Sequence, residues 1–164
     1  MRRKLLMLAA LALVGCAKSA IMPLSVDTLR ISTSAAPACG STGAQDVAFR
    51  RAAIETINRG YDKFIVLGGD AQNNVGVVGY TPVQAHTTGS ATATGYGNVA
   101  YASGQSTTTY SGGQPIIAGT HDQGLVIKMF REGDPAGANA LGAREQLGPK
   151  WAEVVKESAS TTCF

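Results

Sequence analysis

The segment from Ala71 to His121 contains no charged residue and consists mostly of Gly, Thr, Ser, Ala and Tyr. Such a composition has too little hydrophobic mass to form a core, yet a long stretch without charge is also unusual for a solvated linker. Runs such as 91–94 and 107–110 have β character, so we expect either a long hairpin or a disordered loop. Because charged gatekeeper residues are missing, an exposed strand here would be free to pair with another chain.

Tyrosines recur within this segment beside glycines and other small residues. Tyr96, Tyr101 and Tyr110 are therefore candidate binding residues for glycans, for peptidoglycan or for another β-edge. The alternative is that the segment is a tolerated low-complexity loop without a binding role. The sequence leaves both interpretations open.

The N-terminus has the pattern of a secretory signal peptide. Residues 2–4 are basic and residues 5–14 form an apolar run that is too short to span a bilayer as a mature helix. The Leu-Val-Gly-Cys sequence at 13–16 resembles the lipobox of bacterial lipoproteins. That resemblance implies a signal peptide at 1–15, cleavage before Cys16 and attachment of palmitate-type lipid to its sulfur. An ordinary cleaved signal peptide is the alternative.

A lipid anchor would hold the protein on a membrane without a transmembrane helix. Ala17 stands where lipoproteins retained in the inner membrane usually have Asp, which favours the outer membrane, facing the periplasm. Lys18-Ser19, however, resembles a retention pair used by some bacteria, so inner-membrane retention is the alternative.

The charge balance argues against a nucleic-acid partner. The chain has 14 Lys and Arg against 11 Asp and Glu, and the whole excess lies in residues 2–4. The processed chain would therefore be neutral overall and would lack a basic surface for phosphates.

Cysteine use fits an oxidising compartment. With Cys16 lipidated, Cys39 and Cys163 remain as a pair, and we expect a disulfide between them worth roughly 4–5 kcal/mol. A redox-active or intermolecular thiol is the alternative. Too few Cys and His residues remain for a zinc site, and we expect neither a metal nor another cofactor.

The regular elements predict a single α+β domain over residues 28–164, preceded by a tether over 16–27. We expect strands at 28–33, 63–67 and 124–130, the second of them buried on both faces and ended by a turn at 68–70. The strands at 28–33 and 63–67 flank a helix, which predicts a β-α-β crossover with parallel or near-parallel strands in a small mixed sheet. The uncharged stretch, at about 71–121, is an insertion into this domain.

Two or three helices are expected on one face of that sheet. The first has Thr42 as its N-cap, with Gln45 completing a capping box, and ends at Gly60. A second helix begins at Asp134, with Pro135 in its first turn, and places residues 138, 141, 144 and 147 on one face. A third, short helix carries the apolar face formed by residues 151, 154 and 155.

The search for catalytic residues finds little. His121-Asp122 is the sharpest pair, but metal-dependent phosphohydrolases need further ligands, and a surface turn is the simpler interpretation. The chain has no Gly-x-Ser-x-Gly elbow, and the Gly-rich start of the helix near Thr42 lacks the Lys of a phosphate loop. We therefore expect a protein that is not an enzyme.

A resemblance covers about half of the processed chain. The pattern from Arg51-Ala52-Ala53 to residues 59–64 (Arg-Gly-Tyr-Asp-Lys-Phe) resembles a motif of small, uncharacterised proteobacterial lipoproteins. With the lipobox, the β-α-β core and a late cysteine, the chain is also loosely similar to the Rcs stress-sensor lipoprotein. These motifs imply a fold and a location, and they transfer no catalytic residue.

Three functions remain open on this basis. The first is a non-enzymatic binding or structural module of the bacterial cell envelope, which interacts with another envelope protein or with a glycan. The second is a stress-sensing or signalling lipoprotein that reports the state of the envelope. The third is a hydrolase centred on His121-Asp122.

Overall fold

The chain has an α+β fold, as expected, and divides into two compact units. The structure is a computed structural model that describes residues 17–157 and 163. The sheet–helix unit comprises the described residues of Met1–Val75 and Gly119–Phe164, and the hairpin unit comprises Gly76–Ala118. The predicted signal peptide and Cys16 lie outside the described residues.

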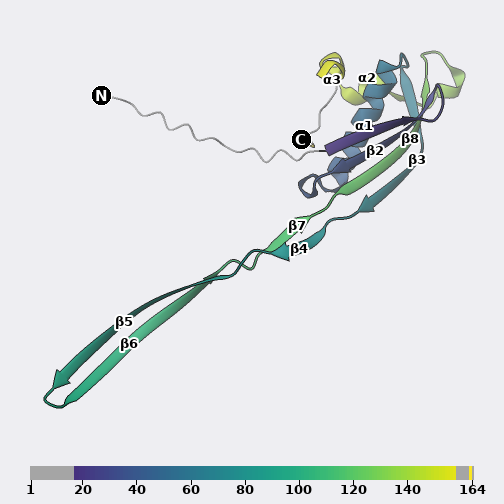
Figure 1. Ribbon diagram of the computed structural model, residues 1–164. Helices are drawn as coiled ribbons and strands as arrows, with labels where there is room; N and C mark the ends of the chain where they lie inside the picture. The colour runs from purple at the N-terminus through teal and green to yellow at the C-terminus, as the bar shows by residue number, and fades with distance from the viewer. Residues whose placement is uncertain (1–16, 158–162, 164) are drawn as a thin grey trace, which may run out of the picture. The chain divides into compact units, whose positions relative to one another are not determined.

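A five-stranded sheet forms the centre of the sheet–helix unit (Figure 1). Its strands, in spatial order, are β1 (Ala17–Pro23), β2 (Thr28–Ala35), β8 (His121–Phe130), β3 (Lys63–Asn73) and β9 (Leu141–Gly142). Each neighbouring pair is antiparallel. Because β8 lies between them, β2 and β3 run in the same direction without pairing. The crossover through the helix is therefore present, but the expected mixed sheet is wrong, since the returning strand β8 makes every pairing antiparallel.

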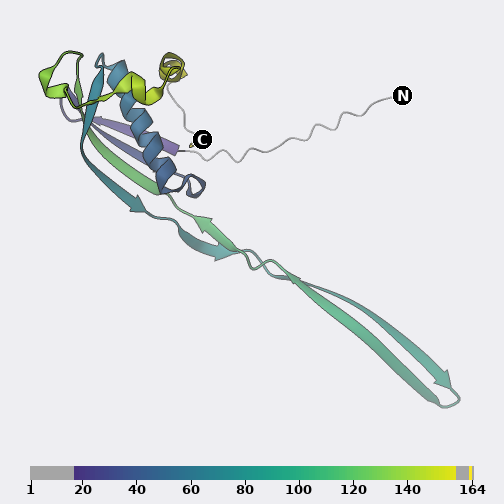
Figure 2. The same cartoon turned by 180° about the vertical axis from the view of Figure 1, so that it is seen from behind.

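Helix α1 (Gly40–Asn58) packs against one face of this sheet (Figure 2). Small residues on the helix, such as Ala48, Ala52 and Ala53, are fully buried and allow a close approach to the strands. The strands contribute larger apolar side chains at alternate positions, as the two-residue period of a strand requires. The core comprises Leu29, Ile31, Ala48, Ala52, Ala53, Phe64, Leu125, Ile127, Met129 and Ala143.

The start of α1 differs from the expected capping box. Pro37–Cys39 forms a 3-10 turn, η1, that leads directly into the helix at Gly40, so Thr42 lies inside the first turn and caps nothing. Cys39 occupies the N-cap position without a side-chain hydrogen bond.

The expected tether over 16–27 is wrong for its described part. Ala17–Pro23 is an edge strand that pairs with β2 along its whole length. Residues 17, 19 and 21 turn toward the side of the sheet that carries α1, and Ser19 hydrogen-bonds Thr33 at 2.9 Å between their hydroxyl oxygens. The small and polar residues of this segment are a weak sequence signal for a strand. The strand forms because its backbone pairs with β2.

Strand β3 does not end at Gly68-Gly69-Asp70, and the turn expected there is wrong. The strand continues to Asn73 because β8 extends far enough to pair with it, after a bulge between Val66 and Gly68. The expectation of burial on both faces is also wrong, since only Phe64 is fully buried while Val66 and Leu67 are exposed.

The helix expected from Asp134 is interrupted. The Asp134 carboxylate accepts a hydrogen bond from the Ala136 N–H, but the turn it caps, η2 (Pro135–Gly137), is a single 3-10 turn. Leu141–Gly142 then pairs with β3, so the predicted helical face through Leu141 does not form. Two short helices follow, α2 (Ala143–Leu147) and α3 (Trp151–Glu157).

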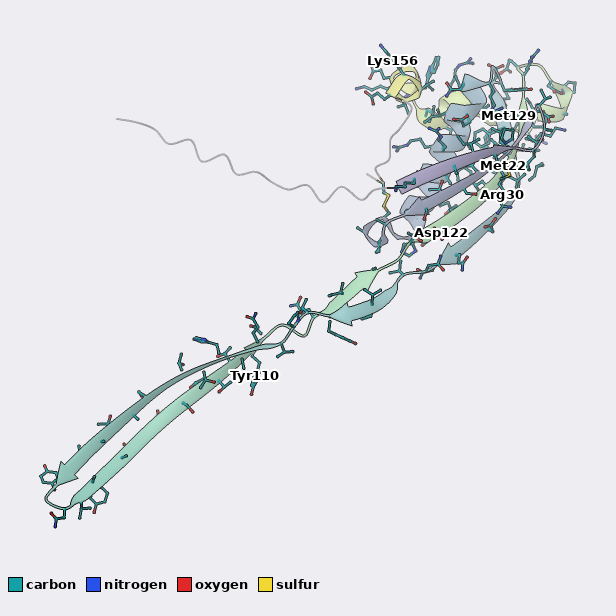
Figure 3. The ribbon with its side chains drawn as sticks, in the orientation of Figure 1. Met22, Arg30, Tyr110, Asp122, Met129 and Lys156 are labelled. Carbon is teal, nitrogen blue, oxygen red and sulfur yellow. A yellow bond between two sulfur atoms is a disulfide. The ribbon has the colours of Figure 1, made fainter. Side chains whose placement is uncertain are left out.

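A disulfide joins Cys39 and Cys163, the pairing expected from the sequence (Figure 3). It links the start of α1 to a residue 124 positions later in the chain, and the two Cα atoms are 5.6 Å apart. A side chain at Gly43 would crowd this bond, because its Cβ would lie 3.2 Å from that of Cys39.

The hairpin unit consists only of strands. A short ribbon pairs β4 (Gly76–Tyr80) with β7 (Pro115–Ala118), and a longer one pairs β5 (Gln84–Tyr96) with β6 (Val99–Ser111). Gly97, with φ of 59°, supplies the left-handed conformation that the two-residue turn between β5 and β6 requires. The uncharged stretch thus forms a hairpin and not a disordered loop. The hairpin unit, Gly76–Ala118, is shorter than the expected 71–121, because β3 continues to Asn73 and β8 begins at His121.

We expect Phe64→Ala to lower the free energy of unfolding by about 3–5 kcal/mol, because it leaves a cavity at a fully buried position. Val99→Ala, at an exposed position of β6, should change it by less than about 0.5 kcal/mol. Urea unfolding followed by circular dichroism measures both, and similar losses in the two variants would contradict this core assignment.

Candidate functional site

The β5–β6 hairpin has two chemically different faces. In its register each residue of β5 lies opposite one of β6, for example Ser90 opposite Gln105 and Ala91 opposite Gly104. One face collects polar side chains, including Thr88, Ser90 and Gln105. The other is built mainly from small residues: Ala85, Gly89, Ala91, Ala93, Gly95, Ala100, Ala102 and Gly104.

The three candidate tyrosines do not form one surface. Tyr96 and Tyr101 lie on the polar face beside the turn. Tyr101 is opposite Thr94, and Thr94 is two residues from Tyr96 on β5, so all three side chains share one face. Tyr110 pairs with Ala85 on the small-residue face, near the other end of the ribbon, where Figure 3 labels it. All three are largely exposed.

The backbone edges of this hairpin are its second chemical feature. All thirteen residues of β5 and all thirteen of β6 are exposed, and within the described residues each strand pairs only with the other. Each strand therefore presents one row of N–H and C=O groups without a strand partner. An isolated two-stranded ribbon is only marginally stable in water, so a further strand on either edge would stabilise it.

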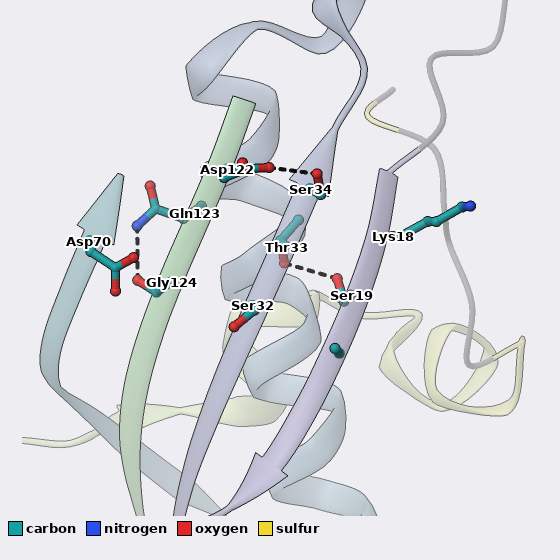
Figure 4. Close-up of a pocket in the computed structure, with 10 residues that line it drawn as sticks. Lys18, Ser19, Ser32, Thr33, Ser34, Asp70, Asp122, Gln123 and Gly124 are labelled. Carbon is teal, nitrogen blue, oxygen red and sulfur yellow. Dashed lines mark hydrogen bonds between the residues drawn. The ribbon is translucent and has the colours of Figure 1, made fainter. Parts of the chain in front are cut away.

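A second candidate site is a hollow of about 400 Å³ on the face of the sheet that points away from α1 (Figure 4). Its lining comes from β1, β2, β8 and β3 and is rich in hydroxyl and carboxylate groups. The residues are Lys18, Ser19, Ala20, Ser32, Thr33, Ser34, Asp70, Asp122, Gln123 and Gly124, of which Ser19 and Thr33 turn their side chains toward the α1 side. Histidine and cysteine do not occur in this lining.

Gly124 shapes the hollow. An ion pair of 3.1 Å joins Arg30 Nη2 on β2 to Asp70 Oδ1 on β3, and it crosses over β8 at this glycine. A Cβ at position 124 would collide with the Asp70 carboxylate. The absence of a side chain there lets the ion pair form, although both partners are exposed and such a pair contributes about 1 kcal/mol or less.

Neighbouring side chains hold the Asp122 carboxylate in place. Its carboxylate accepts hydrogen bonds from Ser34 Oγ at 2.5 Å and from Asn74 Nδ2 at 2.7 Å. The Ser34 hydrogen bond is the main reason that the pKa of Asp122 lies below its ordinary value, because it favours the ionised form against partial desolvation.

The side chains of His121 and Asp122 point away from each other. Adjacent residues of a strand point to opposite faces, so Asp122 lies in the hollow while His121 turns to the other side, opposite Ala35 and Asn73. Its Nδ1 atom is buried without a hydrogen-bond partner. The other histidine, His86, is an exposed residue of β5 in the hairpin unit. The structure thus places the His121 and Asp122 side chains on opposite faces of β8, although both residues border a smaller cavity beside the start of α1.

Within residues 17–157 and 163, no cluster of three or more His, Cys, Asp or Glu residues is placed to hold a metal ion. None of the helices formed by these residues is long and apolar enough to cross a membrane. Cys16, the predicted lipidation site, lies outside this part of the chain.

No protein-family model matches this sequence, and neither the curated proteins nor the solved structures yield a significant match.

Sequence reasoning identified the hairpin segment but missed the hollow. Gly97-Asn98 is a two-residue turn signal between two threonine-rich runs, and it would have favoured the hairpin over a disordered loop. For the hollow, the only local signal was Gly124, an isolated glycine at the start of an apolar strand, which often marks a close approach of another group.

We expect Ser34→Ala to raise the pKa of Asp122 toward its ordinary value, because the variant removes the strongest hydrogen bond to the carboxylate. An NMR titration of the Asp122 side-chain carbon measures this change. Ser32→Ala on the same face of β2 should leave the pKa of Asp122 where it is.

The same shift predicts a pH dependence. A lowered pKa means that Asp122 stabilises the folded state above its ordinary pKa and that this contribution is lost as the pH falls through the folded-state pKa. Asp122→Asn should therefore lose less stability between about pH 5 and pH 2 than the parent chain does. Parallel losses in both proteins over that range would refute this role of Asp122.

Proposed function

We propose that this chain is a lipid-anchored, non-enzymatic binding module of the bacterial cell envelope whose hairpin unit binds another envelope component by strand addition. The observation that carries the proposal is the β5–β6 ribbon, which has two open backbone edges and no buried residue. Natural proteins usually guard such edges with charged residues, bulges or a covering element. Here the whole unit from Gly76 to Ala118 lacks charge.

The chemistry of the ribbon suits burial against a partner. Threonine, serine, alanine and glycine side chains pack without the large desolvation cost of a buried charge. Backbone hydrogen bonds to an added strand would supply affinity, and the different faces of the ribbon would supply specificity. Tyr96 and Tyr101, adjacent on the polar face, are placed to contact the same partner beside the turn.

The N-terminal sequence supports the location. Residues 2–4 and 5–14 have the pattern of a signal peptide, and the lipobox-like sequence that ends at Cys16 would leave the processed chain on a lipid anchor. A neutral processed chain and the Cys39–Cys163 disulfide fit the periplasmic side of the outer membrane. The binding surface then needs to reach only neighbouring molecules of the envelope.

We expect Cys16→Ser to abolish lipid incorporation and to move the protein from the membrane fraction to a soluble fraction. Metabolic labelling with a palmitate analogue, followed by fractionation of the envelope, measures both effects. Cys163→Ser, which breaks only the disulfide, is the matched control and should still be labelled. Labelling that persists in Cys16→Ser would exclude this residue as the lipid site.

A second test removes the hairpin. Gln84 and Ser111 are directly paired, so residues 84–111 can be replaced by an Asn-Gly turn without separating the flanking strands. We expect this variant to keep the Cys39–Cys163 disulfide and to lose the crosslinks that the parent chain forms with other components in native envelopes.

Two further variants separate the alternatives. Arg30→Gln alters the rim of the hollow and should leave the crosslinks intact. A Tyr96→Ala and Tyr101→Ala double variant should weaken binding strongly if the partner is a glycan that stacks on the rings, and only modestly if a protein strand is added to the edge. Recovery of the same partners with and without the hairpin would contradict the proposed function.

A further inference from the structure

The two open edges of the ribbon differ in bulk. Every residue of β5 from Thr87 to Gly95 is Thr, Gly, Ser or Ala, whereas the stretch of β6 directly opposite, residues 100–108, carries Tyr101 and Gln105. Large side chains cover part of the backbone beside them, while small ones leave the N–H and C=O groups open. The β5 edge is therefore the more accessible of the two for an added strand.

We propose that β5 pairs antiparallel with β5 of a second copy of this chain, about a two-fold axis that passes through Ser90. The inference rests on the strand addition of the proposed function and assigns one edge of the same hairpin to a second copy. Joining the two ribbons gives a four-stranded sheet in the order β6-β5-β5-β6, with the second pair from the second copy. Four strands are twice the number in an isolated hairpin, which is only marginally stable in water.

The register follows from the length of the strand. β5 runs from Gln84 to Tyr96, so Ser90 is its middle residue, and only a two-fold axis at Ser90 pairs all thirteen residues. In this register Thr88 of one copy lies opposite Thr92 of the other, and Gly89 lies opposite Ala91. Cross-strand threonine pairs stabilise a sheet, and the hairpin already contains one, with the hydroxyl oxygens of Thr87 and Thr108 2.8 Å apart.

The register also preserves the two faces. A two-fold axis at a residue pairs even-numbered with even-numbered positions, so that polar side chains meet polar ones and small side chains meet small ones. The face formed by Ala85, Gly89, Ala91 and Ala93 would thus continue unbroken from one copy into the other. A one-residue slip would mix the two faces.

Charge favours a second copy as the partner. Two identical strands carry identical charges. A Lys or Glu on β5 near the axis would therefore lie opposite the same residue of the second copy, and the two like charges would repel. The hairpin unit has no charged residue, so this repulsion is absent. A charged partner of a different kind would find no complementary charge on this unit.

The test is a disulfide crosslink at the axis. Ser90→Cys in the full-length chain, kept in native envelopes and oxidised with copper phenanthroline, should give a disulfide-linked dimer. The two Cα atoms at the axis would be about 4.5–5.5 Å apart, within the range for a disulfide. Gln105→Cys is the matched control, because it lies directly opposite Ser90 on β6 and is also exposed. We expect the Ser90 variant to give roughly tenfold more dimer.

A second set of variants tests the register. Thr92→Cys alone should crosslink poorly, because its copies would be separated by about four residues, or ~13 Å, along the strand. Thr88→Cys combined with Thr92→Cys should crosslink efficiently. Dimer from Gln105→Cys in excess of that from Ser90→Cys, or no dimer from either, would overturn the proposal. An intact Cys39–Cys163 disulfide on non-reducing gels shows that each variant is folded.

The outcome is distinguishable from that of the proposed function. If deletion of the hairpin removes a different envelope component while Ser90→Cys gives no dimer, the binding module remains and self-pairing is wrong. If Ser90→Cys gives the dimer while the deletion changes no other partner, self-pairing holds and the binding of another component is wrong.

Discussion

The antiparallel pairing of β3 with β8 is the contact on which both units of this chain depend. Its inner face supplies Phe64, Ile127 and Met129 to the core under α1, and the hairpin unit is the segment between these same two strands. The register of this pair is specified by the buried side chains, since a slip of one residue would turn them toward water. It also sets Asp70 opposite Gly124, which lets the carboxylate reach Arg30 across β8.

The sheet separates two kinds of chemistry on its two faces. Toward α1 the residues are apolar and close-packed, with alanines on the helix matched to larger side chains on the strands. Away from α1 the same strands present hydroxyls and carboxylates around the hollow. The hairpin unit repeats the pattern of unlike faces without a hydrophobic core, so its stability must come from backbone pairing and from whatever it contacts.

Elements with strong apolar periodicity were predictable from the sequence. The strands that include Leu29, Phe64 and Ile127, the helix that carries Ala52, and the disulfide of Cys39 all occur where the sequence indicated.

The failures lie where backbone pairing, rather than side-chain hydrophobicity, determines the structure. β1, the outer part of β3 and β9 are small, polar or Gly-rich segments that become strands because a neighbouring strand is available. The hollow had no local signal beyond Gly124, since four strands far apart in the sequence combine to form it. The tyrosines were identified as a set, but the two-residue period of the strands separates Tyr110 from the other two.

The register of the hairpin has a consequence for how this protein can vary. Residues of β5 and β6 oppose one another one to one from Gln84–Ser111 to Tyr96–Val99, with no bulge. Adding or removing two opposed pairs would keep the other residues on their faces and preserve the alternation of hydrogen-bonded pairs. It would change the span of the ribbon by about 7 Å and would leave the core beneath α1 untouched. The length of the β5–β6 ribbon is thus a quantity that natural variation or an engineer can adjust in steps, independently of the stability of the domain that carries it.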